Sequence, residues 1–329
     1  MSHGYVIAII GATGMVGKEI AATIVERAEF PLRGIRLFAS TRNDGETVYL
    51  NNMRHVVHAL PKDPLSMAQF DNVDVVILAT PFELSKTLAP IFLDEGIVVV
   101  DIGGWTYPGA PKSIAGFQID EEFFAEERYV SIPMSMTTII ARVVAQLQEF
   151  GVMGIRAHAL LGASYKGKQA VEELSSQVSA VFHYREAPQV IFPEGLAFDL
   201  APSLSSESDD STHVQLQLAH ALNMELGQVD VSICFVPIFS GMGISLQILL
   251  QNIDMDEIEQ AFQGSSFGWS HQPSGPKKLM GSSVIQVGKA RVDALGQGIH
   301  LWISADGIHA GVVDNTYAVL THLIDKEIL

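Results

Sequence analysis

The chain has 329 residues, enough for two domains with sizeable cores, and 48% of them are hydrophobic, which excludes a disordered protein. Its formal net charge of −17 argues against binding to nucleic acid or to an anionic membrane surface. The single cysteine, Cys234, excludes an intrachain disulfide and a cysteine-rich zinc site. The apolar runs are too short to span a bilayer, and the first predicted strand leaves no room for a signal peptide. We therefore expect a cytoplasmic protein.

A glycine-rich turn separates the first predicted strand from the first predicted helix. Tyr5–Ile10 is a continuous apolar run that predicts a buried strand, and residues 18–25 predict a helix. A turn of this composition lets the backbone lie against a pyrophosphate while the N–H groups of the first helical turn face the anion. The alternative is a glycine turn that binds nothing. The predicted cofactor-binding residues of this turn are Gly11, Thr13, Gly14, Met15, Val16 and Gly17.

The first third of the chain continues to alternate strands with helices. Residues 35–40, 73–80 and 96–101 are further predicted strands, and their near-continuous apolar, mostly β-branched runs are typical of a parallel sheet that is covered on both faces. We therefore predict an α/β, doubly wound, Rossmann-like NAD(P)-binding domain over residues 1–131.

The character of the sequence changes near residue 131. Strands are predicted from residue 159 onward and at 231–238, 244–250 and 299–304, and the segment 202–211 is predicted to be a surface loop. We expect a second, α+β domain over residues 132–314, with a half-covered and mostly antiparallel sheet. The final segment, 315–329, is predicted to be a helix that packs back on the first domain.

The end of the second predicted strand bears on the choice of nucleotide. An acidic side chain at this position usually binds the ribose of NAD, but this chain has Ser40 and Arg42 there. Arg42 can pair with a 2′-phosphate, which favours NADP(H) over NAD. The alternative is that Arg42 is simply a solvated loop charge.

Several short motifs occur in one order along the chain. They are the glycine loop 11–17, Ala39-Ser40-Thr41-Arg42, Val99-Val100-Asp101, Ala197-Phe198, Val236-Pro237, Lys289-Ala290-Arg291 after Val287-Gly288, and Ala305-Asp306 followed by Gly311 and Asn315. In these the chain resembles the aspartate-semialdehyde dehydrogenase family over nearly its full length, and within it the Usg-type homologues. The resemblance implies an NADP-binding domain, a domain for catalysis and dimerisation, a homodimer or a homotetramer, and Asn315 near the nicotinamide.

The resemblance also implies a reaction that this chain departs from. Family members reduce aspartyl phosphate to the semialdehyde through a cysteine thioester, with a histidine as general base. Met136 stands at the cysteine position and Met242 at the histidine position. The other family positions for substrate binding are Leu161 in place of a glutamine, Tyr107 and Phe235 in place of arginines, and Leu216 in place of a lysine. Cys234 does not replace the nucleophile, because it is predicted to be a buried residue that points to the opposite face from Phe235.

The remaining polar clusters are assigned no chemistry. The pairs His55/His58 and His213/His220 are placed on possible helix faces without acidic partners at metal-binding spacing, so no metal site is predicted. The hydroxyl side chains Ser135, Thr137 and Thr138 are expected to cap a helix.

The leading hypothesis is a homologue that lacks the parent activity and binds NADP(H) as a dimeric non-catalytic protein. The alternatives are an active NADP-dependent oxidoreductase with non-thioester chemistry on an apolar carbonyl compound, and a purely structural dimer. No nucleic-acid or membrane partner is expected.

Overall fold

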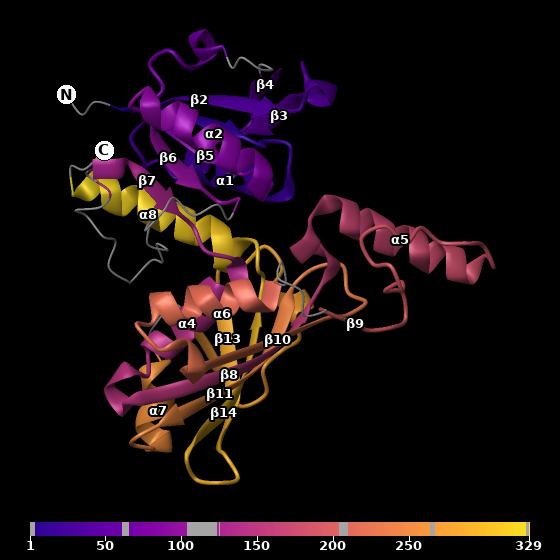
Figure 1. Ribbon diagram of the computed structural model, residues 1–329, viewed down its shortest axis with the longest axis vertical. Helices are drawn as coiled ribbons and strands as arrows, with labels where there is room; N and C mark the ends of the chain where they lie inside the picture. The colour runs from indigo at the N-terminus through magenta and orange to yellow at the C-terminus, as the bar shows by residue number, and fades with distance from the viewer. Residues whose placement is uncertain are drawn as a thin grey trace. The chain divides into compact units, whose positions relative to one another are not determined.

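The structure, a computed structural model, describes residues 4–60, 66–103, 124, 126–203, 210–263, 267–326 and 329. The chain divides into two compact units (Figure 1). Unit 1 comprises Met1–Met134 and Val312–Leu329, and unit 2 comprises Ser135–Gly311.

Unit 1 contains a seven-stranded sheet in the order β3-β4-β2-β1-β5-β6-β7. Every neighbouring pair is parallel except the β3–β4 hairpin. The strands are β1 (Tyr5–Ile10), β2 (Leu32–Ala39), β3 (Thr47–Leu50), β4 (Met53–Ala59), β5 (Val75–Leu78), β6 (Val98–Asp101) and β7 (Tyr129–Ser131). The helices are α1 (Met15–Glu26), α2 (Phe82–Asp94) and α8 (Asp314–Asp325), with short 3-10 turns η1 (Thr41–Asn43) and η2 (Met67–Phe70).

The central strands β1, β5 and β6 of unit 1 are buried on both faces, as the continuous apolar runs predicted. Ile7 and Ile9 on β1 are fully buried, and so are all four residues of β5. A stack of rings covers one face: Phe38 lies 4.6 Å from Phe70, and Phe70 lies 4.8 Å from Phe92 on α2. The predicted doubly wound α/β fold is therefore confirmed.

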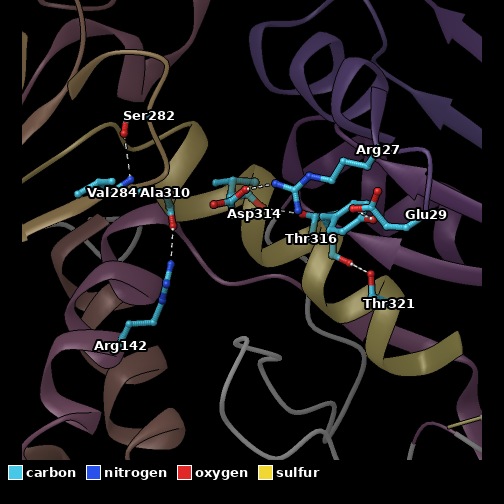
Figure 2. A network of polar contacts seen from close by, with 11 residues as sticks. Arg27, Glu29, Arg142, Ser282, Val284, Ala310, Asp314, Thr316 and Thr321 are labelled. Atoms are coloured by element: carbon cyan, nitrogen blue, oxygen red, sulfur yellow. Dashed lines mark hydrogen bonds and ion pairs between the residues drawn. The ribbon is translucent and has the colours of Figure 1, made fainter. Parts of the chain in front are cut away.

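The C-terminal helix α8 belongs to unit 1 and packs on α1 (Figure 2). The guanidinium of Arg27, just after α1, forms a 2.9 Å ion pair with Asp314 and lies 4.1 Å from the centre of the Tyr317 ring. The Tyr317 hydroxyl donates to Glu29, and burial together with that carboxylate raises the pKa of Tyr317. These contacts fix the first turn of α8, which carries Asn315.

Unit 2 contains a second seven-stranded sheet, in the order β12-β13-β14-β11-β8-β10-β9. Four neighbouring pairs are antiparallel, and the pairs β8–β10 and β12–β13 are parallel, so the predicted mostly antiparallel sheet is confirmed. The strands are β8 (Val152–Leu161), β9 (Ala201–Pro202), β10 (Val229–Phe235), β11 (Met242–Leu250), β12 (Phe267–Ser270), β13 (Ile285–Val292) and β14 (Gly298–Ala305). The helices are α4 (Ser135–Ala145), α5 (Lys168–Phe182), α6 (Asp210–Ala221) and α7 (Met255–Ala261), with 3-10 turns η3 (Gln148–Phe150), η4 (Ala163–Lys166), η5 (Leu226–Gln228) and η6 (Pro276–Leu279).

Among the described residues, one face of the second sheet is more deeply buried than the other. Along β8 the residues Ile155, Ala157 and Ala159 are buried, while Arg156 and His158 between them are exposed. Helices α4 and α6 lie along the buried side, and α5 projects away from the sheet (Figure 1). The opposite face, which we call the open face, carries the alternate strand residues.

Three local predictions are corrected by the structure. The strand predicted from residue 159 begins at Val152. The segment 202–211 is a loop only in part, because β9 ends at Pro202, α6 begins at Asp210, and 204–209 lie outside the described residues. His55 and His58 lie on strand β4 rather than on a helix.

Two searches of the described residues bear on metal binding and on membrane insertion. In the ranges given above, no group of three or more His, Cys, Asp or Glu side chains is placed to hold a metal ion. None of the helices in those ranges is both long and apolar enough to cross a bilayer.

Candidate functional site

The glycine loop after β1 is held by backbone-to-backbone contact that leaves no room for side chains. Gly11 has φ +90°, and a Cβ atom there would clash with the carbonyl oxygen of Ala79, which follows β5. A Cβ atom at Gly17, in the first turns of α1, would clash with the carbonyl oxygen of Gly11. Glycine is therefore required at both positions for helix, loop and strand to approach this closely.

The same loop presents the start of α1 without a side-chain cap. The Gly14 N–H donates to the Gly11 carbonyl at 2.9 Å, and α1 then begins at Met15 with no capping side chain on Gly14. Thr13, Met15 and Val16 are half-buried. The first N–H groups of a helix carry the positive end of its dipole, so this is a suitable place for a phosphate group.

The loop lies at the point where the order of the strands reverses. Strand β1 is paired with β2 on one side and β5 on the other, and the chain fills the β2 side before it returns to β5. The turn after β1 and the turn after β5 therefore meet, as the contact between Gly11 and Ala79 shows. In open parallel sheets, ligands bind in the crevice at this point, beyond the carboxyl ends of the strands.

The side chains that sequence analysis assigned to the rest of the nucleotide lie in the same unit. Ser40 and Arg42 follow β2, and both are exposed. The Ser40 hydroxyl lies 3.0 Å from Asn43 Oδ1, so it already has one local partner. Asn315, in the first turn of α8, is only 1% exposed. Arg42 is thus the accessible cation at the end of the second strand.

Three family positions form one row across the second sheet. Leu161 on β8 is in register with Phe235 on β10 and with Met242 on β11. All three side chains are buried, at 0%, 4% and 2% exposure respectively. Sequence analysis placed these residues at one substrate site from the resemblance alone, and strand register gives an independent reason for their proximity.

Met136 is the second residue of α4 and is fully buried. The turn after β14 links it to the row: a Cβ atom at Gly307 would lie 2.5 Å from the Met242 Cε atom and 3.3 Å from the Ser135 Oγ atom. A Cβ atom at Gly311 would lie 2.6 Å from the Ser135 Cβ atom. The start of α4 and the start of β11 are therefore neighbours across this segment, in which Gly311 has no room for a side chain against Ser135.

Comparison with known families agrees with this geometry. The family model "Semialdehyde dehydrogenase, NAD binding domain" matches residues 6–106, which include the glycine loop. The model "Semialdehyde dehydrogenase, dimerisation domain" matches residues 145–309. The chain belongs to the semialdehyde dehydrogenase family.

Individual relatives within this family are similar over their whole length. The aspartate-semialdehyde dehydrogenase of Rickettsia bellii is 25% identical over 340 residues, covering 98% of this chain and 99% of the relative. That of Aquifex aeolicus is 24% identical, covering 99% and 100%. Among solved structures, Vibrio cholerae aspartate semialdehyde dehydrogenase II in complex with ASA has a TM-score of 0.89 and 22% identity, covering 98% and 99%; the Candida albicans enzyme with NADP has a TM-score of 0.72 and 14% identity, covering 99% and 100%.

Two further family positions differ in their surroundings from the buried row. Leu216 lies on α6 and is 49% exposed, whereas its neighbour Gln217 is buried and accepts a 2.9 Å hydrogen bond from Thr137 on α4. Tyr107 lies outside the described residues. Thr137 is therefore paired between helices rather than capping α4, and Thr138 lies inside α4 with a buried hydroxyl that has no hydrogen-bond partner among the described residues.

Cys234 lies on the open face of the sheet, opposite to Phe235, as sequence analysis predicted. It is half-buried rather than buried as predicted. Phe235 itself lies 5.6 Å from the Phe192 ring, and the Lys166 ammonium, which is paired with Asp210, lies 5.4 Å from the Phe235 ring centre.

A histidine–aspartate pair near this centre was missed by sequence analysis. Asp306 directly follows β14, is 1% exposed, and accepts hydrogen bonds from the backbone N–H groups of Gly281 and Ile308 at 2.7 and 2.9 Å. Its Oδ2 atom also lies 2.9 Å from the His309 Nδ1 atom. Because a carboxylate accepts only, Nδ1 is the donor in this contact. The i, i+3 spacing of the two residues is visible in the sequence, but the spacing alone does not predict a contact, because the turn after β14 is what brings the two side chains together.

We predict that Gly17→Ala destabilises unit 1 and prevents nucleotide binding. The added methyl group meets the Gly11 carbonyl, and overpacking of this kind costs about 1–3 kcal/mol. Urea unfolding should show the loss, and calorimetry with NADPH should show no binding. Gly227→Ala is the matched control, since a Cβ atom there meets nothing within 4 Å; equal effects of the two substitutions would contradict the prediction.

Proposed function

We propose that this protein binds NADP(H) as a homodimer and does not carry out the thioester reaction of its family. The observation that carries the proposal is the pair Met136 and Met242, which occupy the family positions for nucleophile and general base and are 0% and 2% exposed. A thioether has no proton to lose and forms no thioester, and neither methionine can accept a proton from substrate.

The surroundings of the two methionines support the same proposal. Leu161, Phe235 and Met242 form a buried apolar row where the resemblance implies polar contacts to a doubly anionic substrate. Burying a neutral polar group without a hydrogen-bond partner against such a row costs about 2–7 kcal/mol. Burying an unpaired charge there costs more. One substitution would be compatible with an altered nucleophile, but the whole set favours loss of the parent substrate.

The nucleotide half of the proposal rests on the glycine loop and on Arg42. The uncapped start of α1 would hold the pyrophosphate, and Arg42 would pair with a 2′-phosphate. A bound nicotinamide cofactor supplies hydride chemistry. Asn315 would lie near the nicotinamide by resemblance.

The homodimer is supported by the match of residues 145–309 to a dimerisation-domain family model. A homotetramer built from two such dimers is the alternative. Either assembly is consistent with a half-covered sheet in unit 2, whose described helices α4 and α6 lie along the buried side (Figure 1).

We predict that Arg42→Ala weakens NADPH binding roughly tenfold and leaves NADH binding unchanged. The substitution removes one charge-assisted hydrogen bond to the 2′-phosphate, worth about 1.5–3 kcal/mol before screening at this exposed position. Isothermal calorimetry with both cofactors measures the ratio. Arg54→Ala, at another exposed arginine of unit 1, is the control; an absence of any NADPH binding by the unmodified chain would refute the cofactor proposal.

We predict no parent reaction. Incubation with aspartate semialdehyde, phosphate and NADP⁺ should give no increase in nicotinamide absorbance above the enzyme-free rate. Met136→Cys alone should remain inactive, because Met242 still provides no base and the row around it remains apolar. Turnover at the rate of an ordinary dehydrogenase, about 1 per second or faster, would show that the chain is an active member of the family.

The pair Asp306 and His309 favours a second candidate function. The pair lies on the turn that contacts both Met242 and Ser135, so it offers proton transfer at the centre from which the family base is absent. The candidate reaction is direct reduction of an apolar aldehyde or ketone. Hydride would add to the carbonyl carbon while His309, in its imidazolium form, gives a proton to the carbonyl oxygen and is left neutral, which yields an alcohol and needs no covalent intermediate.

We predict for this second candidate that NADPH is oxidised in the presence of medium-chain aldehydes or aromatic ketones, and that His309→Gln lowers kcat by about 10²–10⁴-fold. Asp306→Asn should lower kcat less and change its pH profile, because it acts by orienting the imidazole. His220→Gln, at an exposed histidine on α6, should have no effect. The candidate is rejected if no carbonyl compound of these two classes is reduced, or if His309→Gln leaves the rate unchanged.

A further inference from the structure

Arg27 connects the end of helix α1 to the start of helix α8, and both helices belong to unit 1 (Figure 2). Its guanidinium pairs with the Asp314 carboxylate at 2.9 Å and lies over the Tyr317 ring, 4.1 Å from the ring centre. Asp314 is the first residue of α8 and Tyr317 the fourth, so the two side chains lie on one face of the helix. One planar cation therefore holds the first turn of α8 at two positions.

The same turn makes further contacts with the chain that follows α1. The Tyr317 hydroxyl donates to the Glu29 carboxylate at 3.4 Å, and the Tyr317 ring lies 5.8 Å from the Phe30 ring. Inside α8 the buried Thr316 hydroxyl donates to the Val312 carbonyl at 2.8 Å. The first turn of α8 is thus held from outside by residues 27–30 and from inside by its own side chains.

Asn315 lies within this turn and is only 1% exposed. Its carboxamide carries both donors and an acceptor, which is the complement of the carboxamide on a nicotinamide ring. A buried side chain in a packed helix has little freedom to reorient by itself. The position of the Asn315 carboxamide is therefore set by the orientation of the first turn of α8.

The opposite end of α1 is the proposed phosphate site. The uncapped N–H groups at the start of α1 are proposed above to hold the pyrophosphate, and Arg27 directly follows the last residue of the same helix. A helix of 12 residues is a rigid element about 18 Å long. Through Arg27, this element relates the phosphate site at one end to the turn that carries Asn315 at the other.

The Arg27 contacts affect orientation more than stability. The side chains of Arg27 and Asp314 are 39% and 23% exposed, and ion pairs this accessible contribute little to the free energy of unfolding. A charge-assisted hydrogen bond is nevertheless directional, and here it is combined with a ring contact on the same helix face. Removal of the guanidinium should therefore loosen the turn without unfolding unit 1.

We propose that Arg27 is a positioning residue for the nicotinamide half of the cofactor. Through Asp314 and Tyr317 it orients the first turn of α8, and with it Asn315, relative to the helix that holds the pyrophosphate. It acts through α8 and not by contact with the cofactor. The inference rests on the proposed binding of NADP(H) and names the residue that relates the two ends of the nucleotide site.

Calorimetry with two ligands tests the proposal. One is NADPH, and the other is 2′-phospho-ADP-ribose, which lacks only the nicotinamide ring. Arg27→Met keeps an aliphatic stem and removes the guanidinium; it should weaken NADPH binding about fivefold, a usual size for a residue that acts through others, and leave 2′-phospho-ADP-ribose binding unchanged. The fluorescence of the NADPH that still binds should shift toward that of free NADPH, because its nicotinamide is held less firmly.

Three further variants separate positioning from general damage. Arg27→Lys retains a cation that can reach Asp314 and should restore most of the NADPH affinity. Asp314→Asn should act in the same direction as Arg27→Met but more weakly, because the Tyr317 contact remains. Arg33→Met is the matched control, since it removes another exposed ion pair of unit 1, with Asp74 at 3.4 Å, and should change neither ligand. A circular dichroism melt verifies that each variant is folded.

The outcomes distinguish this inference from the cofactor proposal. If the unmodified chain binds neither ligand, the proposed NADP(H) binding fails and this inference fails with it. If the unmodified chain binds both ligands but Arg27→Met weakens both equally, or weakens neither, NADP(H) binding stands and the positioning role of Arg27 is overturned. The role is also overturned if NADPH binds the unmodified chain no more tightly than 2′-phospho-ADP-ribose does.

Discussion

The close approach of three backbone segments at Gly11 is the constraint on which the nucleotide half of the structure depends. The carbonyl of Ala79 and the first turns of α1 both press on this loop at distances that admit no Cβ atom. Overlap of backbone atoms at these distances cannot be tolerated, whereas the loss of a single hydrogen bond can. It fixes where α1 begins, and so where its uncapped N–H groups lie relative to the carboxyl ends of β1 and β5.

The second unit uses the same device around a centre with different side chains. Gly307 and Gly311 let the turn after β14 lie against Met242 and the start of α4. Methionine is flexible and fills such a space without needing a hydrogen-bond partner. The buried positions of Met136 and Met242 are therefore filled without a polar partner, and this packing is compatible with the proposed loss of the family reaction.

The parts of the fold set by local pattern were predictable, and the parts set by tertiary pairing were not. Continuous apolar runs identified β1, β5 and β6, because a strand that is buried on both faces is apolar along its whole length and is therefore visible in the local sequence. The start of β8 was missed, because Gly154 and Arg156 interrupt its apolar pattern. Strand register explains why Leu161, Phe235 and Met242 lie together, which the sequence alone supported only by resemblance. The sequence alone indicates neither the pairing of Asp306 with His309 nor the exposure of the apolar side chains between residues 181 and 200.

The two candidate functions differ in one physical quantity, the availability of a proton beside an apolar binding surface. The Asp306 carboxylate is 1% exposed and has three donors directed at it, one of them an imidazole. The third donor, His309 Nδ1, orients a ring whose side chain is about one quarter exposed. The second candidate function, hydride transfer without a covalent intermediate, depends on that orientation.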